Sequence, residues 1–411
     1  MKKGEFMDRF GIKTFKMKNG ERYCIIKNKK TGIPVFYPCL FITTQLRNSN
    51  ESIKTIETQA GCIALFYRFL FMRKIDIEKR IQTARFLDNN EIDLLRDFVG
   101  KRMRIPKVTN IKDPHPGVCS ATKYIRLTTI AKYLEWLCQL TIKSKDDGYR
   151  KISYFVTKIK ARRPKIKFRN SEGNFYKTIE DEQLKILLSV IDPECELNPF
   201  DKKVRQRNQL IVMILHSLGI RCGELLNLKV EDIDFAGQII FIRRRADSIE
   251  DTRVNQPLVK TIERDLPMSD QLTKLLHSYI TGERKANIRK KKHGYLFITQ
   301  KEGYTRGDPL SVPSYHKIIY SLRNIDSGLN GLTGHKFRHT WNFLFSKQMD
   351  ESTEYVSEEM QEQMRSRHMG WEPGSGTARI YNRRFIVSKS EQAALGIQNT
   401  IFQKRSGVSY E

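Results

Sequence analysis

A histidine and an arginine three residues apart form the first grouping in this sequence that could do chemistry. His335 and Arg338 stand in the run Gly-His-Lys-Phe-Arg-His-Thr-Trp at residues 334–341, and this spacing places both side chains on one face of a helix. Phe337 and Trp341 add an apolar stripe at helical spacing. A helix start that carries an imidazole and a guanidinium suits a phosphate group. His-x-x-Arg alone is a weak signal, because most such pairs are one helix face with a half-buried histidine.

The charge of the chain indicates a polyanionic partner. Its 411 residues carry 74 Lys and Arg against 46 Asp and Glu, a formal net charge of +28, and an excess of this size is typical of proteins that bind nucleic acid. A membrane surface is the competing polyanion. However, no polybasic helix stands beside a long apolar span, and the apolar runs 62–72 and 210–220 are too short to cross a bilayer. The length suggests two or three globular domains.

Cysteine usage favours a reducing compartment. The seven cysteines are scattered and never spaced as Cys-x-x-Cys, which argues against a disulfide framework and against structural zinc. Cys222 is interpreted as a small packing residue. The basic N-terminus has no apolar stretch behind it, so no signal peptide is expected. We therefore expect a cytoplasmic protein without structural zinc.

Apolar periodicity divides the first part of the chain into a short extension and a helical domain. Residues 1–50 mix short apolar runs with turn signals, which indicates a small β-rich N-terminal extension. Helical spacing recurs over 52–80, 91–104 and 121–141. Residues 51–160 are therefore predicted to form a compact helical domain.

A basic run at residues 158–169 overlaps the end of this domain. It holds seven cations and no acid, and Pro164 blocks a continuous helix. The plain interpretation is a solvated linker, but the charge of the whole chain favours a linker at residues 161–177 that lies along a phosphate backbone. The cations predicted to contact DNA are Lys158, Lys160, Arg162, Arg163, Lys165, Lys167 and Arg169.

A second, mostly helical domain is predicted to begin near Thr178. Thr178 and Asp181 resemble a capping box with Asp in place of Glu or Gln. An apolar-faced helix is expected over 207–218 and is ended by Gly219. Strands are predicted at 238–242 and 258–267, with a polar excursion at 245–256 between them, and further helices at 271–279, 315–322, around His335 and at 354–363.

Four segments of this second domain resemble the motifs of the tyrosine recombinase (phage integrase) family, in the family's order. They are the first arginine box at 219–228, the hairpin lysine segment at 259–267, the His-x-x-Arg box at 334–339 and the tyrosine segment at 369–381. Four boxes in order rarely co-occur by chance. The resemblance implies a mainly α fold with a small antiparallel β-sheet. A helical, SAM-like core-binding domain would precede an α-rich DNA breaking-rejoining catalytic domain at 178–390, with a tail at 391–411.

The resemblance also implies roles for individual residues. Arg221 and Arg338 would donate paired N–H bonds to the non-bridging oxygens of one phosphate. Tyr381 would attack the phosphorus while His335 takes its proton, and Lys260 would protonate the departing 5′-oxygen. The product would be a 3′-phosphotyrosine, formed without a metal ion, a cofactor or ATP.

Two departures from the family pattern affect these assignments. Residues 245–256 lengthen the hairpin that carries Lys260. Trp371, expected to hold a phosphate oxygen through its indole N–H, stands ten positions before Tyr381, one more than the family pattern.

The activity that the resemblance implies is integration, excision or transposition of a mobile element by a site-specific recombinase. The partners would be double-stranded DNA with a specific site, further copies of the chain in a DNA-bound homotetramer, and accessory proteins. The amphipathic stretch 388–402 would dock on a neighbouring protomer, and the location would be the bacterial nucleoid. The alternatives are a DNA-binding protein that kept the fold without catalysis, and a type IB topoisomerase-like or telomere-resolving enzyme. A membrane-surface or ribosomal basic protein would not need Tyr381.

Overall fold

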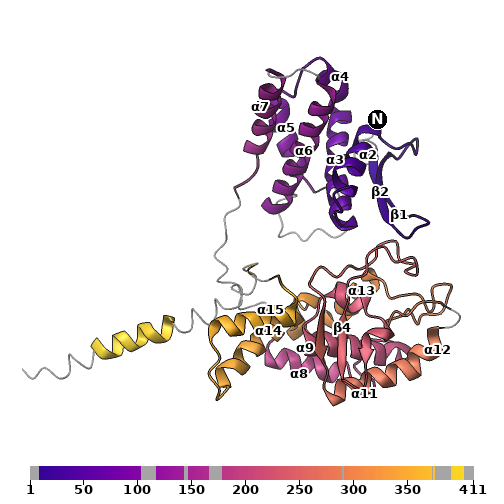
Figure 1. Cartoon of the computed structure of the whole chain (residues 1–411), viewed down its shortest axis with the longest axis vertical. Helices are drawn as coiled ribbons and strands as arrows, with labels where there is room; N and C mark the ends of the chain where they lie inside the picture. The colour runs from indigo at the N-terminus through magenta and orange to yellow at the C-terminus, as the bar shows by residue number, and fades with distance from the viewer. Residues whose placement is uncertain are drawn as a thin grey trace, which may run out of the picture. The chain divides into compact units, whose positions relative to one another are not determined.

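The computed structural model of the chain consists of two compact units, residues 1–169 and 170–411 (Figure 1). It describes residues 9–102, 117–142, 147–165, 178–288, 291–372, 374 and 390–401. In both units the described residues are mainly helical, and each unit carries one small antiparallel sheet. The predicted fold class is therefore confirmed.

The N-terminal unit begins with a β-hairpin. β1 (Phe10–Lys16) pairs antiparallel with β2 (Arg22–Asn28), and Gly20 in the turn has a φ of 95°, a conformation that glycine adopts without steric cost. The helices that follow are α2 (Phe36–Phe41), the π-helix η1 (Ile42–Arg47), α3 (Ile53–Arg73), α4 (Ile77–Gln82), α5 (Asn89–Val99), α6 (Ser120–Thr141) and α7 (Asp147–Ala161).

One apolar core joins the hairpin to these helices. Ile26 of β2, Phe66 of α3 and Leu134 of α6 are fully buried in it. The hydroxyl groups of Tyr67 and Tyr133 lie 2.7 Å apart inside this core. Residues of the first 50 positions therefore share a core with α3 and α6.

Helix α7 extends into the basic run that the sequence suggested to be a linker. It continues to Ala161, so Lys158 and Lys160 lie in its last turn. Pro164 prevents helix formation only in its own immediate neighbourhood, and Phe155 and Ile159 hold the preceding turns in the core.

The C-terminal unit contains a three-stranded sheet among helices. The strands run in the order β3 (Ile233–Asp234), β4 (Ile239–Ile242), β5 (Arg264–Pro267), and neighbouring strands are antiparallel. The helices are α8 (Asp181–Val190), η3 (Lys202–Val204), α9 (Arg205–Leu218), α10 (Cys222–Asn227), η4 (Val230–Asp232), α11 (Asp270–Tyr279), η5 (Ile280–Arg284), α12 (Lys285–Ile288), α13 (Val312–Arg323), η6 (Ser327–Leu329), α14 (Gly334–Glu351) and α15 (Glu358–Met369). Residues 390–401 are helical as well.

Local chemistry explains where several of these elements begin and end. α9 ends at Gly219, whose φ is 59°, as a glycine stop signal predicts. α8 begins at Asp181 and its N-cap is Glu180, whose backbone N–H donates to the side chain of Gln183 at 3.2 Å. The predicted capping residue Thr178 was therefore wrong by two positions. The return strand is also shorter than predicted, because residues 258–263 are not extended partners of β4.

The described helices differ from membrane-spanning helices. None of those in the described ranges is both long enough and apolar enough to cross a bilayer.

Candidate active site

The predicted catalytic residues lie on separate segments of the C-terminal unit. Arg221 stands directly before α10, Lys260 in the segment that leads to β5, His335 and Arg338 in the first two turns of α14, and Trp371 just after α15. Tyr381, the predicted nucleophile, lies outside the described residues.

Arg338 is held by the ends of two other helices. Its side chain is buried, with 1% exposed. One terminal nitrogen donates to the carbonyl of Gly219, after α9, at 3.0 Å, and the other donates to the carbonyl of Met369, at the end of α15, at 2.8 Å. The guanidinium carbon lies 5.3 Å from the centre of the Trp371 ring. Because two carbonyls and one ring fix its plane, the guanidinium is oriented before any ligand arrives.

Glu224 in α10 joins the first arginine box to the hairpin segment. Its carboxylate, 1% exposed, accepts a hydrogen bond from Thr261 at 2.5 Å and pairs with Arg264 at 3.0 Å. It also accepts the backbone N–H of Arg221 at 3.0 Å and lies 3.8 Å from the Arg221 guanidinium. Burial raises the pKa of this carboxyl, but the nearby charges of Arg264 and Arg338 outweigh burial and lower it. Glu224 is therefore ionised at neutral pH.

Arg264 connects β5 to the turn after α15. Its Nε donates to the carbonyl of His368 at 2.5 Å, and the backbone N–H of Ile262 donates to the carbonyl of Gly370 at 3.0 Å. Gly370 has a φ of 63°, and a Cβ there would lie 2.8 Å from the carbonyl oxygen of Ile262. Only glycine fits this close approach. The hairpin and the start of the tyrosine segment are thus fixed to each other.

Lys260 is exposed beside this frame. Its neighbours in sequence are buried, with 9% of Val259 and 4% of Thr261 exposed. Two residues before it, the carbonyl oxygen of Leu258 packs directly on Gly223 of α10, where a Cβ would overlap it. The backbone on either side of Lys260 is therefore held, while its side chain extends from the surface.

The histidines of the site lie in different environments. His335 is exposed, and its ring meets that of His339 edge-on with 4.7 Å between centroids. His368 stacks on Trp341 with 3.9 Å between centroids, and its Nε2 donates to the carbonyl of Leu218 at 3.1 Å. Burial lowers the pKa of His368 to about 4. His368 is neutral at pH 7 and packs between α9 and α14, whereas the ring of His335 is open to solvent.

Cys222, the first residue of α10, follows Arg221 directly. Burial raises the pKa of its thiol to about 12, and the side chain packs against the apolar core. The thiol is therefore protonated at neutral pH.

The structure brings some predicted site residues into one frame. Arg338 contacts Trp371 directly, and Arg221 joins them through the buried carboxylate of Glu224. Lys260 and His335 are exposed on segments that flank this frame. The arrangement combines the oriented guanidinium of Arg338 with the partly exposed guanidinium of Arg221. Such a pair suits a tetrahedral or trigonal-bipyramidal oxyanion, with a separate ammonium and imidazole for proton transfer.

Sequence reasoning missed Arg264 and Thr261 as partners of Glu224. Arg264 alternates in β5 with exposed residues and shares its sheet face with Leu266, of which 1% is exposed. Period-two alternation could therefore have predicted a buried arginine. Its partner could not be predicted, because Glu224 lies 40 positions earlier.

Four of the cations predicted to contact DNA bind groups of their own unit. These are Lys158, Lys160, Arg162 and Arg163. Arg162, for example, pairs with Asp93 at 3.2 Å. Lys165 is exposed, and Lys167 and Arg169 lie outside the described residues.

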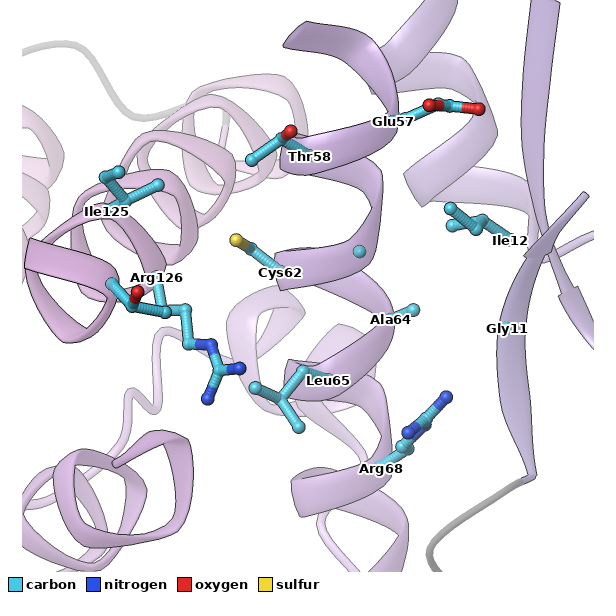
Figure 2. A pocket seen from close by; sticks show the side chains of 12 residues that line it. Gly11, Ile12, Glu57, Thr58, Cys62, Ala64, Leu65, Arg68, Ile125 and Arg126 are labelled. Atoms are coloured by element: carbon cyan, nitrogen blue, oxygen red, sulfur yellow. The ribbon is translucent and has the colours of Figure 1, made fainter. Parts of the chain in front are cut away.

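A groove of about 430 Å³ lies between β1, α3 and α6 of the N-terminal unit (Figure 2). Its charged side chains are already engaged. Arg68 donates to the carbonyl of Phe10, Arg126 donates to that of Val99, and Glu57 accepts from a threonine hydroxyl at 2.6 Å. The groove therefore offers no evident acid–base pair, and the groups suited to catalysis lie in the C-terminal unit.

Comparison with known proteins identifies the class. The model of the phage integrase family matches residues 177–385, and this chain belongs to that family. It is 26% identical over 323 residues to transposase A from transposon Tn554 of Staphylococcus aureus, across 74% of this chain and 78% of that protein. It is also 26% identical over 164 residues to tyrosine recombinase XerC of Bacillus pumilus, across 39% of this chain and 45% of XerC.

Solved structures show the same fold. The XerH site-specific recombinase bound to its difH substrate aligns with a TM-score of 0.50 at 19% identity, over 81% of this chain and 78% of XerH. The Tn1549 transposon integrase in complex with a circular intermediate DNA aligns with a TM-score of 0.50 at 14% identity, over 87% of this chain and 99% of the integrase chain.

Proposed function

We propose that this chain is a site-specific recombinase that integrates or excises a mobile element through a covalent 3′-phosphotyrosine. Two neighbouring sets of contacts carry the proposal. The carbonyls of Gly219 and Met369 orient Arg338, and the buried carboxylate of Glu224 ties Arg221 to Arg264 of the hairpin segment. Two guanidinium groups, that of Arg338 held by two carbonyls, suit the extra negative charge of a phosphorane-like transition state. The complex of the Tn1549 integrase with DNA supports double-stranded DNA as the substrate.

The proposed reaction divides proton transfer between two exposed groups. The phenol oxygen of Tyr381 attacks the phosphorus, and His335 takes the phenolic proton. The bond from phosphorus to the 5′-oxygen breaks, and the ammonium group of Lys260 supplies a proton to that oxygen. No step requires a metal ion or ATP, since the phosphotyrosine bond retains the energy for rejoining. Each proton transfer is typically worth about 10²–10⁴-fold in rate.

Tyr381→Phe tests the nucleophile. The probe is a nicked suicide duplex that spans the attachment junction of the element encoding the chain, on which the wild-type protein first locates the cleaved bond. We expect the variant to bind the duplex but to form no covalent adduct on a denaturing gel, because the phenol oxygen is absent. An adduct that persists in the variant would exclude Tyr381, and DNA binding without any wild-type adduct would favour the non-catalytic alternative.

We also propose that the C-terminal helix at 390–401 docks on a neighbouring protomer of a DNA-bound tetramer. Ala393, Ile397 and Ile401 recur every fourth residue and so share one face of this helix. Ile397 and Ile401 are each more than half exposed, which leaves an apolar face to be covered. On a native gel, the protein that lacks residues 388–411 is expected to bind a single DNA site but to form no tetrameric complex. Unchanged tetramer formation by the truncated protein would contradict this proposal.

A further inference from the structure

The segment that lengthens the hairpin before Lys260 is folded onto the C-terminal unit. Within residues 245–256, Asp251 is fully buried and Arg253 is 8% exposed. Their side chains pair at 2.7 Å, and the Nε of Arg253 donates to the same carboxylate at 2.9 Å. A polar excursion in solvent would not desolvate both charges, because burial of an ion is costly unless it is fully paired.

Arg253 ties this segment to the helix that follows Arg221. Its Nη1 donates to the carbonyl of Leu226 in the last turn of α10 at 3.0 Å, and to the carbonyl of Leu310 at 2.8 Å. Its guanidinium lies over the ring of Tyr295, 4.6 Å from the centroid. The carbonyls in the last turn of a helix lack partners within the helix, so Arg253 satisfies one of them.

A second set of contacts closes the base of the segment. The side-chain oxygen of Gln256 accepts the backbone N–H of Ser248 at 3.2 Å, and its amide nitrogen donates to the carbonyl of Arg245 at 3.1 Å. Arg245 in turn pairs with Asp232 at 2.5 Å. The backbone at Gln256, from which the chain continues to Lys260, is therefore held in place.

Helix α10 also contacts the chain on both sides of Lys260. The carbonyl oxygen of Leu258 packs on Gly223, and the hydroxyl of Thr261 binds Glu224. Helix α10 thus has Arg221 at its first end and the Arg253 contact at its last, and the Lys260 backbone lies along it between Gly223 and Glu224.

We infer that Arg253 is a positioning residue, which fixes the distance between Lys260 and Arg221 by holding the 245–256 segment on the end of α10. This inference rests on the proposed function, in which Lys260 protonates the 5′-oxygen as its bond to phosphorus breaks and the bond from Tyr381 forms. Buried ion pairs add little net stability compared with apolar residues of the same volume. The benefit of the Asp251–Arg253 pair is therefore geometric, namely a fixed path for an unusually long connection.

The test compares two leaving groups. One suicide duplex carries the normal 5′-oxygen at the cleaved bond, and the other carries a bridging 5′-sulfur. A thiol has a pKa of about 8.5, so the sulfur departs as a thiolate without a proton from Lys260. A variant that only misplaces Lys260 is therefore slow on oxygen and recovers on sulfur. A variant with a general folding defect, or with a damaged phosphate-binding site, is slow on both.

We expect Arg253→Gln to lower the rate of covalent adduct formation on the oxygen duplex by about 10–100-fold, up to the loss caused by Lys260→Ala. On the sulfur duplex both variants should approach the wild-type rate. Arg338→Lys should stay slow on both duplexes. The matched control is Arg207→Gln, which removes another buried guanidinium of the unit, bound to the carbonyl of Ile298 at 2.9 Å, and should keep the wild-type ratio of the two rates.

A second variant guards against misfolding of Arg253→Gln. Gly223→Ala keeps Arg253 and improves helix propensity, but its Cβ would overlap the carbonyl oxygen of Leu258, so this backbone must shift and Lys260 with it. The same recovery on sulfur is expected. Equal losses on both duplexes for the two variants would overturn the positioning role. A wild-type protein that cleaves neither duplex would instead overturn the proposed function on which the inference rests.

Discussion

The two units of the chain bury very different kinds of side chain. Among the described residues, the buried charged side chains of the N-terminal unit are Arg22 and Glu57, and those of the C-terminal unit are Arg207, Glu224, Asp232, Asp251, Arg253, Arg264, Arg338 and Arg365. The N-terminal core relies on aromatic and aliphatic packing, with a tyrosine pair as a polar contact. Each buried charge costs desolvation. The C-terminal unit therefore gives up some stability to hold several guanidinium groups in place, whereas the described part of the N-terminal unit buries one, that of Arg22.

The largest expected effect is removal of charge at the centre of the C-terminal frame. Glu224→Gln leaves Arg264 buried without its carboxylate, which should lower the free energy of unfolding by about 3–5 kcal/mol and prevent adduct formation. The same change in the N-terminal unit, Glu57→Gln, should cost only about 0.5–1.5 kcal/mol, since its cationic partner Lys54 is 73% exposed. Urea unfolding measures the C-terminal unit by fluorescence of Trp341 and Trp371 in a Trp136→Phe background, and the N-terminal unit by fluorescence of Trp136 with the other two tryptophans replaced by phenylalanine. Equal losses in the free energy of unfolding for the two variants would contradict the difference between the units.

A second expected difference concerns pH. The folded pKa of His368 is about 4, against an ordinary value of 6.5, so between these values the unfolded chain binds a proton that the folded chain does not. The free energy of unfolding of the C-terminal unit should therefore be highest above pH 6.5. Protonation of His368 in the unfolded chain should lower it by roughly 2–3 kcal/mol as the pH falls toward 4. Burial also lowers the pKa values of His216 and His293, which adds to the slope.

His368→Gln is the matched variant for this pH effect. Glutamine can still donate to the carbonyl of Leu218 but does not titrate, so part of the pH slope should disappear. The described part of the N-terminal unit holds no histidine, and its unfolding should move less between pH 7 and pH 5. Unfolding curves at both pH values provide the measurement, and an unaltered slope in the variant would contradict the assignment.

The smallest expected effect sharpens the comparison from the N-terminal side. Tyr67→Phe leaves the Tyr133 hydroxyl buried without the partner it has at 2.7 Å, which should cost about 1–2 kcal/mol. Tyr133→Phe should cost less, since Tyr67 keeps Glu78 at 3.2 Å. Both variants should leave adduct formation per folded molecule unchanged. A loss of cleavage in either one would show that the N-terminal core also supports catalysis.

Local signals predicted much of the fold. The glycine at 219 marked the end of α9, and the apolar stripe over 121–141 marked α6 almost to the residue. Errors arose where two local signals competed. The basic run from Lys158 suggested a linker where α7 in fact continues to Ala161, and Thr178 offered a plausible cap two positions before the true one, Glu180.

The candidate site was predictable in its residue types but not in its support. Order and spacing of the boxes predicted Arg221 and Arg338. Nothing in the sequence indicated that Asp251 and Arg253 would be buried, because a polar run of this kind is usually solvated. Their burial depends on carbonyl groups of Leu226 and of a residue 57 positions beyond Arg253. Contacts at such separation follow from the completed fold rather than from local pattern.

The buried thiol beside the first arginine affects how the enzyme can be handled. Because the pKa of Cys222 is about 12, alkylating reagents and mild oxidants, which attack thiolates, should leave it intact at neutral pH. Cys119 is exposed, and a hydrogen bond with the Thr122 hydroxyl lowers its pKa. Maleimide dyes should therefore react first at Cys119 in the N-terminal unit, which allows fluorescent labelling of a working enzyme without chemical damage next to Arg221.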